Sequence, residues 1–154
     1  MSPSGPADPY DLDRFVRAQA DCHARVADEL SAGSKRSHWM WFVFPQIAGL
    51  GHSGMARRYA IRDLDEARAY LRHPVLGPRL LACTRLVNEV VGRSARQIFG
   101  TPDDLKFCSS MTLFEIVAEA DAPFAAAIDK YYAGRRDQAT LALLDGSTFR
   151  CRSD

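Results

Sequence analysis

Residues 37–51 read SHWMWFVFPQIAGLG and hold both tryptophans of the chain and two of its eight phenylalanines. Large apolar side chains are costly to expose, so this density indicates a specific structural or binding use. The apolar run at 39–44 suits either a buried strand or about one and a half turns of buried helix. A lone strand would lack a ladder partner in a helical chain, and the residue before a proline avoids the helical region. We therefore predict a short helix or extended turn that ends before Pro45.

Helical periodicity extends over the rest of the chain. Apolar residues recur at three- and four-residue steps from Leu12 to Leu30, where Asp11 offers a cap and Gly33 a stop. Further helices are predicted from Ser53, over 64–72, 77–91, 94–99, 102–120 (with a possible kink at 108–110), 123–132 and 138–144. No segment shows period-two alternation and no Asn-Gly hairpin signal occurs. The prediction is an all-α fold, a single compact domain of about seven to nine mostly short helices.

The length of 154 residues suits one domain, which we place at residues 9–145. Residues 1–8 are rich in proline, glycine and serine and are expected to be disordered, and 146–154 are expected to form a loose tail. Hydrophobic residues make up 47% and charged residues 25%, which is ordinary for a soluble domain.

The net charge of +1 gives no global attraction to nucleic acid or acidic lipid, so neither is an expected partner. The basic pairs Lys35-Arg36, Arg57-Arg58 and Arg135-Arg136 are interpreted as solvated helix ends rather than phosphate sites. Cysteines 22, 83, 108 and 151 lack zinc-type spacing, and Cys22, Cys83 and Cys108 are interpreted as buried thiols of a reducing compartment. No signal peptide and no apolar run of about 20 residues is present, so we predict a cytoplasmic protein.

The aromatic stretch also carries polar groups that could bind or react. His38 could be a general base or could hold the segment in place, since imidazole titrates near neutral pH. Trp39 or Trp41 could stack on a flat or cationic ligand, and Gln46 could be a backbone clamp or a ligand reader. Residues 49–54 match a G-x-G-x-x-G pattern, but without a βαβ unit a dinucleotide fold is not expected. The loop could still bind an anion through backbone N–H groups.

A second polar group lies at 106–112. Lys106 is three residues from Ser109 and four from Ser110, so a helix would place them on one face, where a desolvated lysine could activate a serine. The alternative is that Ser109 and Thr112 only bond to nearby carbonyls. The four histidines lack metal-ligand spacing, so neither a metal nor another cofactor is predicted.

Three blocks resemble the signature of the domain-of-unknown-function family 1810: KRSHWMWFVFPQIAGLGHS, RYAIRDLDEARAYLRHPVLGPRL and DDLKFCSSMTLF. That family consists of small, mostly bacterial proteins, sometimes mislabelled calpastatin. The resemblance runs from about Asp8 to Leu144 and implies a compact all-α fold, but no activity, cofactor or catalytic residue. The family's blocks fall on His38, Trp39, Trp41, Pro45, Gln46, Gly49, Gly51, Tyr59, His73, Lys106, Ser109 and Thr112.

Two functional hypotheses follow, and the sequence leaves open whether the protein is an enzyme. The first is binding of, or action on, a small anionic or aromatic metabolite such as a nucleotide derivative. The second is a non-catalytic interaction or structural protein that uses the aromatic stretch for core or homodimer packing. The first predicts that residues 38–51 and 106–112 meet at one cleft. Its candidate catalytic residues are His38, Lys106 and Ser109, and its candidate ligand-binding residues are Lys35, Arg36, Trp39, Trp41, Gln46, Gly49, Gly51, Ser53, Tyr59 and Thr112.

Overall fold

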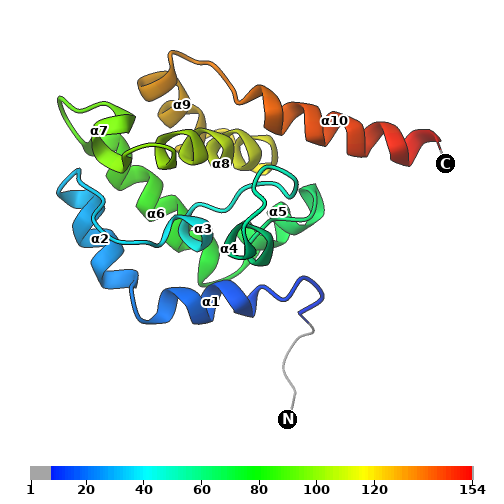
Figure 1. Ribbon diagram of the computed structural model, residues 1–154, viewed down its shortest axis with the longest axis horizontal. Coiled ribbons are helices and arrows are strands. Elements are labelled where there is room, and N and C mark those ends of the chain that lie inside the picture. The colour runs from blue at the N-terminus through cyan, green and yellow to red at the C-terminus, as the bar shows by residue number, and fades with distance from the viewer. Residues whose placement is uncertain (1–7, 154) are drawn as a thin grey trace, which may run out of the picture.

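The computed structural model describes residues 8–153, with side chains through Asp145, and it is built of helices (Figure 1). The all-α prediction is confirmed. Apart from Asp8, the predicted N-terminal tail lies outside the described residues. The helices are α1 Asp13–Ala20, α2 His23–Ser31, α3 Met40–Val43, α4 Gly54–Arg58, α5 Leu64–Arg72, α6 Leu76–Glu89, α7 Ala95–Phe99, α8 Asp103–Val117, α9 Phe124–Tyr132 and α10 Gln138–Ser153.

Helix α8 forms the centre of the molecule (Figure 1). All eight residues from Phe107 to Phe114 are buried, so this helix has no solvent-facing side along that stretch. A helix that is covered all round belongs to the core of a protein. The serine run inside it does not interrupt the helix. Thr112 donates to the carbonyl oxygen four residues earlier at 2.8 Å, and the kink considered at this point stays a prediction.

The aromatic stretch forms the short helix α3, as predicted, and the helix ends before Pro45. It contributes buried side chains to the core, among them Trp39, Met40 and Phe44. Two residues after Pro45 the chain makes one parallel β-bridge, between Ile47 and Ile61. This bridge sets the loop after α3 beside the segment between α4 and α5.

Local capping signals place several helix starts correctly. The side chain of Ser53 accepts a hydrogen bond from the Ala56 N–H at 3.1 Å, and that of Asp63 accepts one from the Glu66 N–H at 2.9 Å. Helix α5 has the predicted bounds. The carboxylate of Glu66 does not complete a capping box, however, because it turns to other partners described below.

Two boundaries differ from the sequence-based prediction. The single helix expected from Leu12 to Leu30 is divided at Asp21 and Cys22 into α1 and α2. Helix α1 packs on α3 whereas α2 packs on α6, so each of the two helices has its own packing partner. The last helix is predicted to end at Leu144, but it continues to Ser153 and runs away from the body of the molecule (Figure 1), while the looseness expected of residues 146–154 stays a prediction.

Among the described residues, no helix is both long and apolar enough to cross a bilayer.

Candidate functional site

Glu29 holds the start of the aromatic stretch. This residue is only 8% exposed, and its carboxylate accepts hydrogen bonds from the Arg36 N–H at 2.7 Å, from the Ser37 N–H and hydroxyl at 3.1 and 2.6 Å, and from the Trp39 indole at 2.9 Å. Burial would raise the pKa of Glu29, but these hydrogen bonds outweigh it and lower the pKa to about 2. Trp39 is therefore a buried structural residue, while the side chain of Arg36 is exposed.

Lys35 is occupied by neighbours of its own chain. Its ammonium lies 2.9 Å from the Asp103 carboxylate and donates to the Ser37 carbonyl oxygen at 2.6 Å. It also lies 5.1 Å from the centre of the Trp39 ring, and its side chain is 6% exposed. The ammonium that the sequence suggested for pairing with a ligand is therefore already paired within the protein.

The two segments that were expected to meet do contact each other. Phe44 packs edge-on against Phe107, with ring centres 4.9 Å apart. The Lys106 ammonium lies 5.3 Å from the centre of the half-buried Trp41 ring and 3.6 Å from the Asp103 carboxylate. The contact consists of packed rings and an ion-pair cluster, and a shared ligand cleft at this place stays a prediction.

The three candidate catalytic residues do not form a bonded group in the described part of the chain. His38 is exposed, and no hydrogen bond joins Lys106 to Ser109 within residues 8–145. The Ser109 hydroxyl lies 3.1 Å from the Asp137 carboxylate, and Thr112 accepts from the Asp137 N–H at 2.9 Å. Ser109 and Thr112 therefore tie α8 to the start of α10, and their roles toward a ligand stay predictions.

Packing accounts for the glycines of the loop after α3. Gly49 has φ +107, and a Cβ built there would lie 3.1 Å from the Leu143 side chain. A Cβ on Gly51 would lie 2.5 Å from that of Ala56, which no real structure tolerates without movement. Ser53 caps the five-residue helix that follows. The loop thus packs closely against α4 and α10.

Two further predicted ligand residues also have structural contacts. Tyr59 is buried, with its ring 5.7 Å from that of Phe15 and 5.4 Å from that of Phe42. Gln46 is half-buried, and its backbone oxygen accepts from the Ile61 N–H at 2.8 Å. The binding roles proposed for these residues are not tested by the packing.

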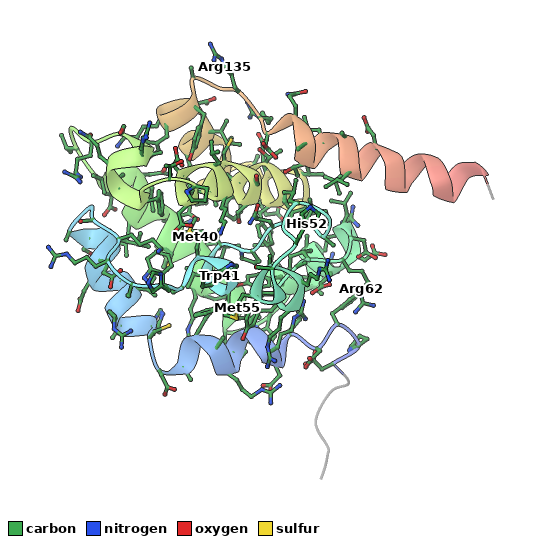
Figure 2. The ribbon with its side chains drawn as sticks, in the orientation of Figure 1. Met40, Trp41, His52, Met55, Arg62 and Arg135 are labelled. Carbon is green, nitrogen blue, oxygen red and sulfur yellow. The ribbon has the colours of Figure 1, made fainter. Side chains whose placement is uncertain are left out.

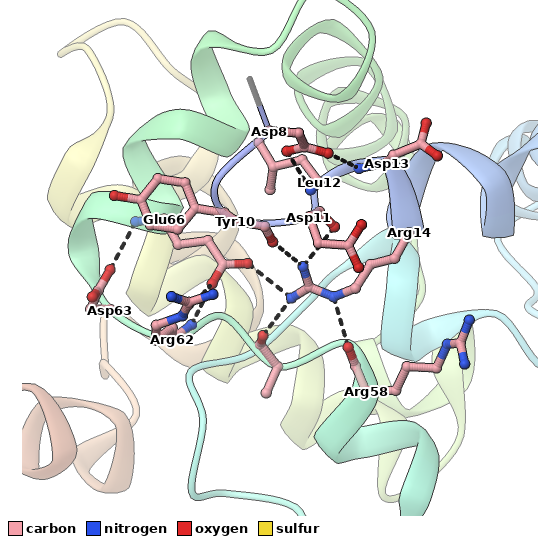
Figure 3. Close-up of polar contacts among 11 residues, drawn as sticks. Asp8, Tyr10, Asp11, Leu12, Asp13, Arg14, Arg58, Arg62, Asp63 and Glu66 are labelled. Atoms are coloured by element: carbon pink, nitrogen blue, oxygen red, sulfur yellow. Dashed lines mark hydrogen bonds and ion pairs between the residues drawn. The ribbon is translucent and has the colours of Figure 1, made fainter. Parts of the chain in front are cut away.

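Arg14 is the anchor of a different site (Figure 3). Its guanidinium has five N–H donors, and all are used within the protein. It joins the segment before α1 to the segment between α4 and α5 and to one carboxylate of α5. The acceptors are the backbone oxygens of Arg58 at 2.7 Å, Tyr10 at 2.5 Å, Asp11 at 2.9 Å and Ala60 at 2.9 Å, and the Glu66 carboxylate at 2.9 Å.

Glu66 completes this anchor from α5. Its side chain is 1% exposed, and the carboxylate accepts from Arg14 and from the Arg62 N–H, each at 2.9 Å. A buried carboxylate is stable only when it is paired and hydrogen-bonded, and both conditions are met. This pair could not be predicted from the sequence, because Arg14 and Glu66 are 52 positions apart and no spacing pattern links them.

A cleft of about 510 Å³ opens beside this pair, within the usual size range of small-molecule sites. We call it the arginine cleft. The β-bridge between Ile47 and Ile61 holds the chain at one wall, where Ala48 and Ala60 leave room because their side chains are small. The cleft is lined by Tyr10, Asp11, Arg14, Ala48, Arg57, Arg58, Ala60, Arg62 and Glu66.

Three exposed arginines give the cleft its charge. Arg57 and Arg58 form no ion pair within the described part of the chain, and the Arg62 guanidinium is 3.8 Å from Glu66, whose carboxylate already serves Arg14. Arg62 also lies 5.4 Å from the centre of the Tyr10 ring. Figure 2 shows Arg62 at the edge of the molecule, near the segment that leads into α1. Guanidinium groups in such positions are suited to carboxylate and phosphate.

A larger hollow of about 660 Å³ lies between α8, α9 and the start of α10. Two of its cations are already used: Arg136 pairs with Glu115, and Lys130 donates to the carbonyl oxygens of Asn88 and Val90. A third, Arg135, points away from the body (Figure 2). This hollow therefore offers a ligand less free charge than the arginine cleft.

Metal and thiol chemistry receive no support from the described residues. They contain no group of three or more His, Cys, Asp or Glu side chains that could hold a metal ion. Cys22, Cys83 and Cys108 are buried free thiols, as predicted. Burial raises the pKa of both Cys83 and Cys108 to about 11, which makes them poor nucleophiles. Cys151 lies outside the residues whose side chains are described.

The fold and this cleft define a small all-α protein with a candidate anion-binding site. Residues 9–144 match the family described as protein of unknown function (DUF1810), and the chain belongs to that family, as its sequence blocks indicated. The chain is also similar to the crystal structure of the conserved hypothetical protein Rv1873 from Mycobacterium tuberculosis. The two are 59% identical, with a TM-score of 0.88, over 90% of this chain and 99% of that one. A search of curated proteins gave no match.

Proposed function

We propose that this protein binds a small anionic metabolite, such as a nucleotide derivative, in the arginine cleft. The observation that carries the proposal is the set of three exposed guanidinium groups, on Arg57, Arg58 and Arg62, around one hollow of about 510 Å³. Cations gathered around one cleft focus its field and favour an anionic ligand. The fixed wall formed by Arg14 and Glu66 supports this role, because a preorganised site loses less entropy on binding.

This site differs from the one expected from the sequence. Lys35 and Lys106 share the Asp103 carboxylate, so their charges are partly neutralised. Arg57-Arg58 had been interpreted as a solvated helix end, and the pair does lie at the end of α4, but it also lines the cleft. The proposal is confined to binding, because the buried carboxylate of Glu66 is already committed to Arg14.

Calorimetry with adenosine monophosphate tests the proposal. We expect the wild type to bind the nucleotide and the triple variant Arg57→Ala, Arg58→Ala, Arg62→Ala to lose at least tenfold in affinity. The matched control is Arg96→Ala on α7, whose exposed side chain forms no hydrogen bond or ion pair with the described residues and does not line the cleft. Equal affinity in the triple variant and the control would refute the proposal.

The alternative, an interaction or structural protein, is favoured by the burial of the aromatic stretch itself. Trp39, Met40 and Phe44 are each at most 2% exposed, and they pack in the core. The observation supports the core-packing form of this hypothesis more than the homodimer form. Sedimentation of Trp41→Ala separates the two forms, since a change of oligomeric state would place the half-buried Trp41 in an interface.

We also keep the cytoplasmic location as part of the proposal. Its support is the presence of three buried thiols with no disulfide among the described residues, which suits a reducing compartment. Cell fractionation with an antibody to the protein tests it, and recovery in a membrane or extracellular fraction would contradict it.

A further inference from the structure

The charges of the arginine cleft indicate which kind of anion it binds. We infer that the cleft selects a phosphate monoester in its dianionic form, carried on a hydroxyl-bearing group such as a ribose. This inference rests on the proposed function and names the class of ligand for the same site.

The cleft carries more positive than negative charge. Arg14 and Glu66 are bonded to each other at 2.9 Å and neutralise one another. Arg57, Arg58 and Arg62 remain as three positive groups, while Asp11, which also lines the cleft, supplies one negative group. Two positive charges are thus left for the ligand to balance. A carboxylate or a phosphate diester brings one negative charge, whereas a phosphate monoester brings about 1.5 to 2 at neutral pH.

The three free arginines of the cleft come from two segments of the chain. Arg57 and Arg58 come from the end of α4, and Arg62 comes from the segment just before α5. Guanidinium groups form two parallel hydrogen bonds with phosphate oxygens, so cations from two segments can address different oxygens of one group. Arg14 fixes these segments to each other, because it donates to the backbone oxygens of Arg58 and Ala60. Arg14 is a positioning residue here, since none of its donors is free for the ligand.

The cleft also has room for the part of the ligand that lies beyond the phosphate. A volume of about 510 Å³ is far more than one phosphate group fills, so the ligand has a body. The Asp11 side chain forms no hydrogen bond with the described residues. An ionised carboxylate only accepts hydrogen bonds, so it suits a hydroxyl or amino group of that body.

Hydrogen bonds within the protein fix the backbone of Asp11. Its φ of +50 lies in the left-handed region, which aspartate adopts more readily than most residues. Its N–H donates to the Asp8 carbonyl oxygen at 3.1 Å, and its own carbonyl oxygen accepts from Arg14 at 2.9 Å. The adjacent Tyr10 is half-buried and presents aromatic surface at the same rim. These contacts fix the rim of the cleft where the body of the ligand would lie.

Calorimetry with a graded set of compounds tests the inference at pH 7.5. We expect adenosine monophosphate and ribose 5-phosphate to bind at least tenfold more tightly than cyclic adenosine monophosphate, which is a diester with one charge. Inorganic phosphate should bind more weakly than either monoester, because it has no body for Asp11 to contact. Adenosine, which lacks the charge, should not bind.

The pH dependence gives a second readout. The second ionisation of a phosphate monoester occurs near pH 6, so the dianion falls to roughly a tenth of the total at pH 5. Affinity for adenosine monophosphate should therefore fall up to about tenfold from pH 7.5 to 5, while that for the cyclic diester stays constant. The other titratable groups facing the ligand are Tyr10, Asp11, Glu66 and the four arginines, and the cyclic diester is the control for any contribution from them.

The variant Asp11→Asn separates the roles within the cleft. Loss of its negative charge should tighten binding of inorganic phosphate at least twofold and reduce the preference for ribose 5-phosphate over phosphate. Equal binding of the cyclic diester and the monoester, or a pH-independent affinity for the monoester, would overturn this inference and leave anion binding intact. Absence of binding by every anion of the set would overturn the proposed function together with it.

Discussion

The aromatic stretch and the arginine cleft each depend on one buried carboxylate, but they leave very different chemistry free. Glu29 accepts hydrogen bonds from two backbone N–H groups, a hydroxyl and the indole of Trp39, and Trp39 itself is buried in the core. Glu66 pairs with Arg14, and the wall they form leaves three other arginines exposed around a hollow. The tryptophan-containing segment thus belongs to the structural core, while three exposed arginines form the candidate site.

The largest expected effect is on the aromatic side of this comparison. Trp39→Ala should lower the free energy of unfolding by about 3–5 kcal/mol, since it removes a fully buried ring and one donor to Glu29. Trp41→Ala is the matched control, because Trp41 is half-buried, and it should cost about 1–2 kcal/mol. Urea titrations measure both. Similar losses for the two variants would contradict the prediction that the deeper burial of Trp39 makes it the more important residue for stability.

Removing the Arg14 anchor of the arginine cleft should lower the free energy of unfolding somewhat less than Trp39→Ala does. Arg14→Ala removes the nearer of the two cations beside buried Glu66, and it leaves the carbonyl oxygens of Tyr10, Arg58 and Ala60 without a donor among the described residues. We expect a loss of about 3 kcal/mol, at the lower end for a broken buried pair because Arg14 retains some solvent contact. Chemical denaturation measures it. A loss below about 1 kcal/mol would show that the pair does not support this side of the molecule.

The pH dependence of stability tests the role of Glu29. The folded pKa of about 2 lies below the ordinary value of 4.5, so this group stabilises the protein above pH 4.5 and the gain is lost as pH falls from there toward 2. The shift corresponds to about 3 kcal/mol. In Glu29→Gln this part of the acid destabilisation should be absent, and stability at pH 7 should fall by about 2–3 kcal/mol. Parallel pH profiles of the variant and the wild type would contradict this account.

The smallest stability effect belongs to the rim of the cleft. Arg58→Ala removes an exposed side chain without an ion pair among the described residues, so the free energy of unfolding should change by less than about 0.5 kcal/mol. Binding of adenosine monophosphate should nevertheless weaken severalfold. Differential scanning calorimetry with and without the nucleotide reports both quantities. If Arg58→Ala is destabilised and still binds the nucleotide normally, Arg58 has a structural role and not a binding role.

Much of the fold could be predicted because its signals are local. The bounds of α5 follow from the Asp63 cap and His73-Pro74, and α3 stops where Pro45 requires. The division between α1 and α2 was missed, since it depends on the different partners that these helices pack against. Spacing along one helix carries no information about where a neighbouring helix lies.

The candidate site was far less predictable than the helices. Residues 38–51 and 106–112 contact each other through Trp41 with Lys106 and Phe44 with Phe107. The sequence predicted a shared cleft there, which stays a prediction. It gave no indication that the lysines there share Asp103, nor that Arg14 reaches Glu66. Whether a charged side chain is free or neutralised depends on partners far away in the chain, and composition does not reveal them.

The bonds from Arg14 to the carbonyl oxygens of Tyr10 and Asp11 have a practical consequence for how the protein is handled. A shortened chain that begins at Leu12 would keep every helix and every exposed arginine of the cleft, yet it would lack two of the five acceptors that hold the anchor. Such a chain should hold Arg14 less firmly and bind adenosine monophosphate more weakly than the longer chain. A purification tag therefore belongs ahead of Asp8, and proteolytic trimming up to Asp11 should be checked before any binding measurement.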